Sequence, residues 1–426
     1  MGRSNRSPIR EACIKIAHLV EGVRGSYRTM RATERLNEEL IETRKTLASE
    51  NDYDAELADC LSAIQTRQKS LVPESLFDGT YGRIATNRGT GAIPSFRCCF
   101  PDETAFAFVD PDPDSTPAYC WRHCDAVVVW GIKPNTGKSE LMRHARNADV
   151  PLFFTEDGFL KSVNTAAADC DPKWKTGISM TADCLTSHYD GTRPSTLERW
   201  LNSDTIVSEE ERREARKWID FIVENRLTKY NHQPIYEPAV GSKGRKKVLV
   251  VDQSYGDFSV RRGLADEQTF EYMLRCAVEE NPDADILVKT HPDTLAGRGG
   301  YFTGLPKRGN VIPITFPINP ISLLLTVDRV YVVSSQFGFE ALMCGKNVSV
   351  FGLPFYSNWG LTDDRLRCPR RTQSRSLEEV FAMAYMRYSH YCNPQTGRRC
   401  GIEEALHWLL EQRAVYHERH NTRAVA

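Results

Sequence analysis

Short apolar runs alternate with segments of helical periodicity along the chain beyond about residue 95. In the first half the apolar runs are FAFVD, DAVVVW and VPLFFTED, at residues 106–110, 125–130 and 150–157. The helical segments that follow are LERWLNS and EEERREARKWIDFIVENRL, at 197–203 and 209–227. Short apolar runs between helical windows are typical of strands buried on both faces, so this pattern predicts a parallel sheet covered by helices.

A second series of the same kind follows a polar stretch with Pro and Gly, YNHQPIYEPAVGSKGRKK, at residues 230–247. Its apolar runs are KVLVVDQ, ADILVKTHP, NVIPITF, DRVYVVSS and NVSVFG, which begin at residues 247, 284, 310, 328 and 347. The polar stretch has the composition of an interdomain linker. Two Rossmann-like units that are joined by one linker and face a cleft are the plan of a GT-B glycosyltransferase fold.

The length of 426 residues also favours two domains, because single cores stop growing at about 250 to 300 residues. We predict an N-terminal Rossmann-like domain on the acceptor side at residues 95–235, and a C-terminal one on the donor side at 245–385. Residues 386–426 are predicted to form C-terminal helices that can cross back over the cleft.

Residues 1–75 are predicted to form an additional helical segment. Ile16, Leu19, Val20 and Val23 make one apolar stripe of a helix, and residues 1–35 carry eight Lys or Arg against three Glu. A basic amphipathic helix of this kind can lie on an anionic membrane surface. The alternative is that the stripe packs on a neighbouring helix or on a second subunit, and the sequence leaves both open.

The overall composition narrows the class of protein. Lys and Arg number 55 against 56 Asp and Glu, so no general field for binding nucleic acid is expected. No stretch approaches the roughly 18 apolar residues of a membrane span, and the N-terminus lacks a signal-peptide core. The 13 cysteines are scattered without paired CxxC sets. We expect a cytoplasmic protein with reduced thiols, with peripheral contact at the inner face of the cytoplasmic membrane as an option.

Polar residues follow the apolar runs of the second series. They are QSYGDFS after VLVVD, THPD after DILVK, and SSQFGFEA after RVYVV, at residues 253–259, 290–293 and 334–341. Ligands bind at the carboxyl ends of parallel strands, and hydroxyls at a helix N-terminus suit a phosphate. Singly, the serines could be helix caps and His291 a structural residue. Three such turns at one sheet edge favour a binding site.

The first series has an acidic turn at the matching position. Glu156 and Asp157 follow VPLFFT and should lie opposite Asp257 across the cleft, where they could divide proton-transfer and nucleophilic roles. A helix N-cap is the alternative. The segment TGKS at 136–139 ends like a phosphate-binding loop, but the upstream glycine is one position out of register and Pro134 removes a donor. A strand-to-helix turn with Gly137 and a solvated Lys138 is favoured there.

Five separated motifs resemble the KpsC-type capsule polysaccharide proteins, a family of retaining β-Kdo glycosyltransferases with a GT-B fold that use CMP-Kdo. The motifs are FFTEDGFLKSV, VLVVDQSYGDFSV, ILVKTHPD, VYVVSSQFGFEALMCGKNVSVFG and PFYSNWGLTDD. The resemblance runs from about Trp130 to Leu410. Family members often carry two modules in tandem, whereas this chain has one.

The resemblance implies roles for individual residues. Asp257 matches the catalytic aspartate of a QxxxD motif, and Glu156 is the second catalytic candidate. The residues implied in donor binding are Gln253, Lys289, His291 for the CMP phosphate, the paired serines Ser334 and Ser335, Gly338, and Glu340 for the ribose. The acceptor or cleft candidates are Lys133 of the WGxK turn, Asp157, Lys161 and Trp359. Lys161 stands where the family usually has Arg, and Ser357 and Asn358 also depart from the pattern.

These roles imply a retaining transfer of Kdo from CMP-Kdo to a glycolipid or surface polysaccharide, through an Asp257 covalent intermediate and without a metal or other cofactor. The chemistry could instead use another nucleotide sugar. A third hypothesis is a non-catalytic module that scaffolds a polysaccharide assembly complex.

Overall fold

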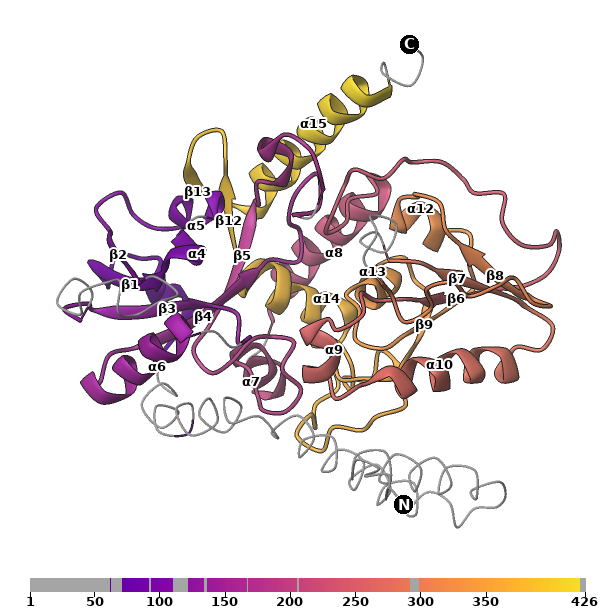
Figure 1. The fold of residues 1–426 in the computed structure, drawn as a ribbon, viewed down its shortest axis with the longest axis horizontal. Coiled ribbons are helices and arrows are strands. Elements are labelled where there is room, and N and C mark those ends of the chain that lie inside the picture. The colour runs from indigo at the N-terminus through magenta and orange to yellow at the C-terminus, as the bar shows by residue number, and fades with distance from the viewer. Residues whose placement is uncertain are drawn as a thin grey trace, which may run out of the picture.

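The computed structural model describes residue 62 and residues 71–91, 93–109, 122–133, 136–166, 168–204, 207–291 and 299–421. The predicted helices of residues 1–75, with their apolar stripe, lie almost entirely outside these residues. The described residues form two α/β units, which lie on the left and on the right of Figure 1. Within them, no helix is both long and apolar enough to cross a membrane.

The first unit is built on a seven-stranded sheet with the order β13-β12-β5-β4-β3-β1-β2. Its strands are β1 (Arg83–Asn87), β2 (Ala105–Val109), β3 (Ala126–Trp130), β4 (Leu152–Asp157), β5 (Ser179–Asp183), β12 (Ser389–Asn393) and β13 (Arg398–Cys400). Its helical segments are η1 (Pro73–Leu76), α4 (Arg88–Gly91), α5 (Pro94–Cys98), α6 (Thr136–Ala148), η4 (Pro172–Lys175), α7 (Thr196–Asn202) and α8 (Glu209–Glu224). The sheet therefore begins upstream of residue 95, where the sequence pattern placed the domain boundary.

This first sheet is mixed, whereas the sequence predicted a parallel one. Strands β1 to β4 are parallel, but β5 pairs antiparallel with β4. The reason lies in the connection at 158–178, in which the described residues form no helix longer than the 3-10 helix η4. A parallel return needs a crossover of a dozen or more residues, usually helical, to carry the chain back to the starting edge.

The second unit holds a six-stranded, fully parallel sheet with the order β11-β10-β9-β6-β7-β8. Its strands are β6 (Lys247–Val251), β7 (Asp285–Lys289), β8 (Val311–Ile314), β9 (Arg329–Val332), β10 (Asn347–Val350) and β11 (Asp363–Asp364). Its helices are α9 (Phe258–Arg262), α10 (Glu267–Glu280), α12 (Pro320–Leu324) and α13 (Phe337–Met343). The strand order reverses between β6 and β9, and ligands bind at such a switch point.

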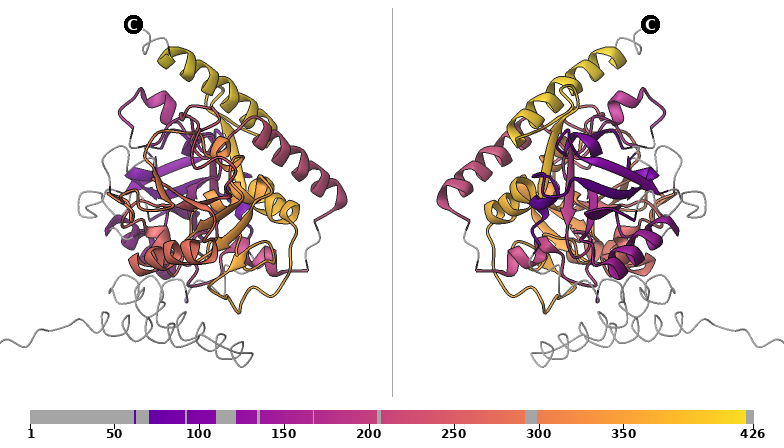
Figure 2. Two further views of the ribbon diagram at one scale, coloured as in Figure 1. Left: turned by 90° about the vertical axis from the view of Figure 1, so that its right-hand side faces the viewer. Right: turned by 90° about the vertical axis from the view of Figure 1, so that its left-hand side faces the viewer.

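The chain then returns to the first unit. After α14 (Leu377–Phe381) and the π-helical turn η5 (Ala382–Arg387), the hairpin β12–β13 adds to the first sheet beside β5. The segment predicted as helical from residue 386 thus contains two strands before α15 (Ile402–Asn421). Arg413 of α15 donates to the carbonyl oxygens of Asn225 and Arg226 at 2.7 and 3.1 Å, which ties α15 to the end of α8 (Figure 2).

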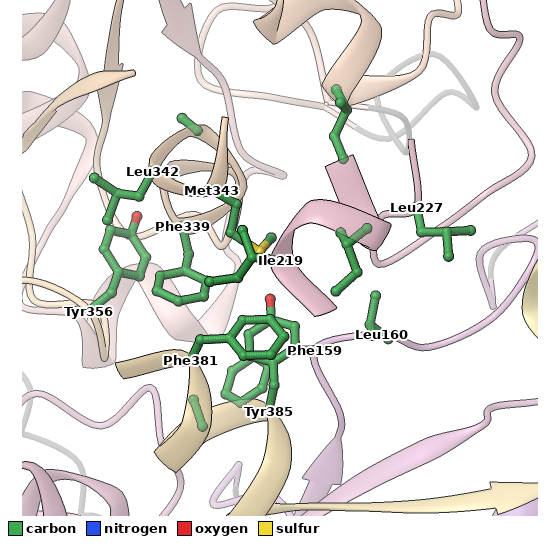
Figure 3. Close-up of a cluster of buried hydrophobic side chains, with 14 of the residues drawn as sticks. Phe159, Leu160, Ile219, Leu227, Phe339, Leu342, Met343, Tyr356, Phe381 and Tyr385 are labelled. Atoms are coloured by element: carbon green, nitrogen blue, oxygen red, sulfur yellow. The ribbon is translucent and has the colours of Figure 1, made fainter. Parts of the chain in front are cut away.

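A continuous apolar core joins the two units. Figure 3 shows side chains from the loop after β4, from α13 and from η5 in one cluster. The ring of Tyr385 stacks on those of Phe159 and Phe339, with centroids 4.9 and 5.5 Å apart. Gln336 also donates to the carbonyl oxygen of Phe159 at 2.6 Å. These contacts fix the first unit against α13 of the second.

Candidate active site between the two sheets

A cavity of about 790 Å³ lies between the carboxyl ends of the two sheets. The first unit contributes acidic, basic and aromatic side chains, among them Lys133, Glu156, Asp157, His188 and Tyr189. The second unit contributes Gln253, Ser254, Asp257, His291, Ser334 and Ser335. The structure therefore brings both predicted catalytic carboxylates, from sheets far apart in sequence, to one cavity.

Asp257 stands at the end of the turn that follows β6. Its carboxylate Oδ1 accepts a hydrogen bond from the backbone N–H of Ser259 at 2.9 Å, and its own N–H donates to the Ser254 carbonyl oxygen at 3.1 Å. The preceding Gly256 has φ +74°, a conformation that strongly favours glycine. The turn thus holds one carboxylate oxygen as the N-cap of α9 while the side chain stays exposed to the cavity.

Hydrogen bonds between Gln253 and Ser334 link the segments that follow β6 and β9, the two strands at the switch point. The backbone N–H of Ser334 donates to Gln253 Oε1 at 3.1 Å, and Gln253 Nε2 donates to Ser334 Oγ at 3.2 Å. The Ser335 hydroxyl accepts from the N–H of Phe337 at 3.2 Å. Gln253 is nearly buried, so its amide fixes the position of Ser334.

His291 and Lys289 come from the end of β7. The Nδ1 atom of His291 lies 3.1 Å from the Ser254 hydroxyl, which links the turns after β6 and β7. Lys289 is 3% exposed, and its Nζ donates to the Thr290 carbonyl oxygen at 2.9 Å. Burial lowers the pKa of Lys289 to about 8, because a charged amine is poorly solvated there.

A second, smaller cavity of about 110 Å³ adjoins the first, and Lys229, His291 and Ser335 line both. Lys289 and Glu340 line the smaller one. Glu340 is buried, accepts a hydrogen bond from the N–H of Lys229 at 3.3 Å, and has its pKa raised to about 7 by burial. The smaller cavity therefore combines cationic and acidic groups.

Glu156 is the last but one residue of β4 and lines the side of the larger cavity that the first unit forms. Its Oε1 accepts a hydrogen bond from the Tyr189 hydroxyl at 2.9 Å. Burial, followed by the adjacent charge of Asp157, raises the pKa of Glu156, while the Tyr189 hydrogen bond and the charges of Lys229 and Lys138 oppose that rise. Gly131 has φ +61°, and a side chain there would collide with the Glu156 carboxylate. The first unit thus leaves room for this carboxylate and orients it.

Three residues predicted for the site lie outside the lining of both cavities. Trp359 was an acceptor candidate, but it is fully buried and its indole donates to the Phe355 carbonyl oxygen at 2.8 Å. Lys161 forms an ion pair with Asp157, which does line the larger cavity. Gly338 was a donor candidate, yet it packs against Tyr356, whose ring would clash with any side chain there. These residues support the site rather than line it.

The TGKS segment, residues 136–139, forms the first turn of α6. Lys138 is nearly buried and donates to the carbonyl oxygens of Trp130 and Lys133, the latter at 3.2 Å. A helix follows β3, as predicted, but the prediction that Lys138 is solvated is wrong, because its amine bonds back to carbonyl oxygens at the end of the strand.

Sequence reasoning missed Tyr189 and Lys229. Tyr189 lies in the loop after β5, and Lys229 lies between the end of α8 and the linker. Neither follows a strand of a predicted parallel sheet, so the strand-end argument could not find them. The polar strand ends themselves were visible in the sequence.

Comparison with known proteins places this chain among capsule biosynthesis proteins. A family model described as "Capsule polysaccharide biosynthesis protein" matches residues 125–243 and 235–393. The capsule polysaccharide modification protein LipA of Neisseria meningitidis serogroup B is 41% identical over 298 residues, which are 68% of this chain and 41% of LipA. The chain thus spans less than half the length of LipA. The lipopolysaccharide-processing protein LpsZ of Rhizobium meliloti is 37% identical over 305 residues, 71% of this chain and 68% of LpsZ.

Solved structures match the same fold. Thermosulfurimonas dismutans KpsC, beta Kdo 2,4 transferase, has a TM-score of 0.67 and 37% identity, and the match covers 77% of this chain and 98% of that chain. The beta Kdo 2,7 transferase of the same KpsC has a TM-score of 0.54 and 24% identity, covering 78% and 99%. The predicted GT-B fold, with two Rossmann-like units facing a cleft, is confirmed.

Proposed function

The chain belongs to the capsule polysaccharide biosynthesis protein family, and from this premise we propose that it is a glycosyltransferase that moves Kdo from CMP-Kdo to a glycolipid or surface polysaccharide acceptor. One observation carries the proposal. Asp257 and Glu156, from opposite units, line a single cavity together with the phosphate-binding candidates His291, Ser334 and Ser335. The similarity to a structure named as a Kdo transferase supports the choice of sugar.

The reaction proceeds by two displacements. In the first, the exposed carboxylate of Asp257 attacks the anomeric carbon of Kdo, the bond from that carbon to the phosphate oxygen breaks, and CMP leaves with the electron pair. In the second, Glu156 takes the proton of the acceptor hydroxyl, the acceptor oxygen bonds to the anomeric carbon, and the bond to Asp257 breaks. Two inversions retain the configuration.

The environments of the two carboxylates suit these roles. Asp257 is exposed to the cavity and oriented by the backbone of α9, so its carboxylate can reach the donor as the nucleophile. The pKa of Glu156 is raised by burial, and a general base works best when its pKa approaches the working pH. The division of roles follows from the difference between the two environments.

The leaving CMP is stabilised by groups of the second unit. His291, Ser334 and Ser335 offer donors to the phosphate from the ends of β7 and β9, and Lys289 and Glu340 line the adjoining smaller cavity. Preorganised donors aimed at developing charge can supply the stabilisation that a divalent metal supplies elsewhere. We therefore propose that neither a metal nor another cofactor takes part, and that the acceptor approaches from the cytoplasmic face of the membrane.

The test is a transfer assay with CMP-Kdo generated in situ, since the donor is labile, and a panel of glycolipid and oligosaccharide acceptors. Mass spectrometry should show the addition of one Kdo, and NMR should show a β-linkage. The matched control is Asp257→Asn. Absence of any Kdo transfer across the panel, together with no binding of CMP, would refute the proposal.

A further inference from the structure

Lys229 lies on a turn that forms hydrogen bonds with both units. Its carbonyl oxygen accepts hydrogen bonds from the N–H groups of Lys161 and Ser162 at 3.1 and 3.2 Å, and its own N–H donates to Glu340 at 3.3 Å. Asn231 is fully buried and braces the same turn, donating to the carbonyl oxygens of Ser162 and Thr228 at 3.1 and 2.8 Å. The base of the Lys229 side chain is therefore fixed between the two sheets.

The ammonium group of Lys229 has no ion-pair partner within the part of the chain that the structure describes. Its Nζ lies 5.8 Å from the centroid of the Tyr230 ring, and the Nζ of Lys161 lies at the same distance from that centroid. Lys161 differs because it pairs with Asp157. A half-buried cation loses part of its hydration, and among the described residues no carboxylate lies within ion-pair distance of this one. The arrangement points to an anion supplied by a ligand.

Lys229 also occupies a central position. It lines both the cavity of about 790 Å³ and that of about 110 Å³. Its positive charge lowers the pKa of Glu156 on one wall, of Glu340 in the smaller cavity, and of His188 at the interface. An anion bound at Lys229 would therefore sit between the Glu156 wall and the turns of the second unit.

We propose that Lys229 binds the carboxylate of the donor sugar, an inference that rests on the proposed function. Kdo carries two anionic groups at its anomeric carbon, the phosphate and the carboxylate. In the proposed function the phosphate binds to His291, Ser334 and Ser335 of the second unit. The charge of Lys229, in contrast, also acts on Glu156 of the first unit. The carboxylate would otherwise repel the attacking Asp257, and a cation beside it removes that repulsion.

The experiment compares two ligands on three variants. Calorimetry measures the affinity for CMP and for a non-hydrolysable phosphonate analogue of CMP-Kdo. Lys229→Met keeps the length of the side chain and removes its charge, and Lys229→Arg restores the charge. Lys217→Met is the control, because Lys217 lies exposed on α8 over the Trp218 ring, 4.1 Å from its centroid, and lines neither cavity. Thermal unfolding checks that each variant is folded.

For Lys229→Met we expect binding of the analogue to weaken about 10- to 100-fold, as for a lost charge-assisted contact, while CMP binding stays within about twofold. Lys229→Arg should recover part of the loss, and Lys217→Met should match the wild type. An equal loss for both ligands would assign Lys229 to the phosphate and refute the carboxylate contact, and so would unchanged binding of the analogue. If the wild type binds neither ligand, the proposed function itself fails.

Discussion

Removing the Tyr189 hydroxyl tests how the first unit controls Glu156. In Tyr189→Phe, the hydrogen bond of 2.9 Å to Glu156 Oε1 is lost. That hydrogen bond favours the ionised carboxylate and so lowers the pKa of Glu156. Without it the pKa of Glu156 is higher, and the base remains protonated over a wider range of acidic pH. The acid limb of the activity profile should therefore move to higher pH.

The size of the effect follows from the strength of the lost contact. A hydrogen bond to a charged group contributes about 1.5 to 3 kcal/mol. At about 1.4 kcal/mol for each factor of ten, the ionised fraction of Glu156 at a fixed acidic pH falls about 10- to 100-fold. On the alkaline side of the limb Glu156 is ionised in both proteins, so the variant should approach wild-type activity there. The predicted loss is thus confined to low pH.

The assay is the pH dependence of kcat/KM for the acceptor, which reports the step in which Glu156 is proposed to take the acceptor proton. Tyr236→Phe is the control, because that hydroxyl donates to the Pro317 carbonyl oxygen at 3.1 Å outside both cavities. If the rate of Tyr189→Phe falls by the same factor at every pH, the reasoning is refuted, since Tyr189 would then act on something other than the ionisation of Glu156. An unmoved acid limb would refute it equally.

Four further predictions address the site and its support. Asp257→Asn should abolish Kdo transfer while calorimetry shows CMP binding nearly unchanged, because the carboxylate acts at the anomeric carbon. His291→Ala should weaken CMP binding and lower kcat together, about tenfold or more, because a phosphate contact is lost; unchanged CMP affinity would make His291 structural. Protein treated with EDTA should keep its activity, and restoration by magnesium of a lost activity would contradict the phosphate roles assigned to the second unit. Gly338→Ala should lower the free energy of unfolding by about 1 to 3 kcal/mol in urea, because the added methyl group meets the Tyr356 ring.

The strand ends of the second unit were predictable because the information is local. A parallel strand buried on both faces reads as an apolar run, and the residue after it lies at the ligand-binding edge. That reasoning located Asp257, His291 and Ser334 without any knowledge of the packing. Glu156 could be found in the same way, because β1 to β4 of the first unit are also parallel.

Features decided by distant contacts could not be predicted in this way. The pairing of β12 with β5 joins residues more than 200 positions apart, and nothing in either segment specifies the partner. Trp359 lies in a motif that the sequence assigned to the cleft, yet its side chain points into the core and lies beneath Arg371, 5.4 Å from the ring centroid. A motif gives the position of a residue along the chain, whereas the direction of its side chain depends on the tertiary packing.

The loop after β5 connects the two proposed catalytic carboxylates, Glu156 and Asp257, through a short chain of contacts. Tyr189 holds Glu156, and two residues later the N–H of Gly191 donates to the Arg262 carbonyl oxygen at 2.8 Å, at the end of α9. Asp257 caps the other end of that five-residue helix.

Gly191 can make this approach because it has no side chain, since a Cβ atom there would lie 3.0 Å from Leu353 and 3.1 Å from the Arg262 carbonyl oxygen. One loop and one short helix thus link the proposed nucleophile and base by direct contacts. A substitution at Gly191 should disturb both displacements together, whereas Tyr189→Phe disturbs only the second. Rates of each half-reaction, followed by the appearance of CMP and of product in a single turnover, would separate these two outcomes.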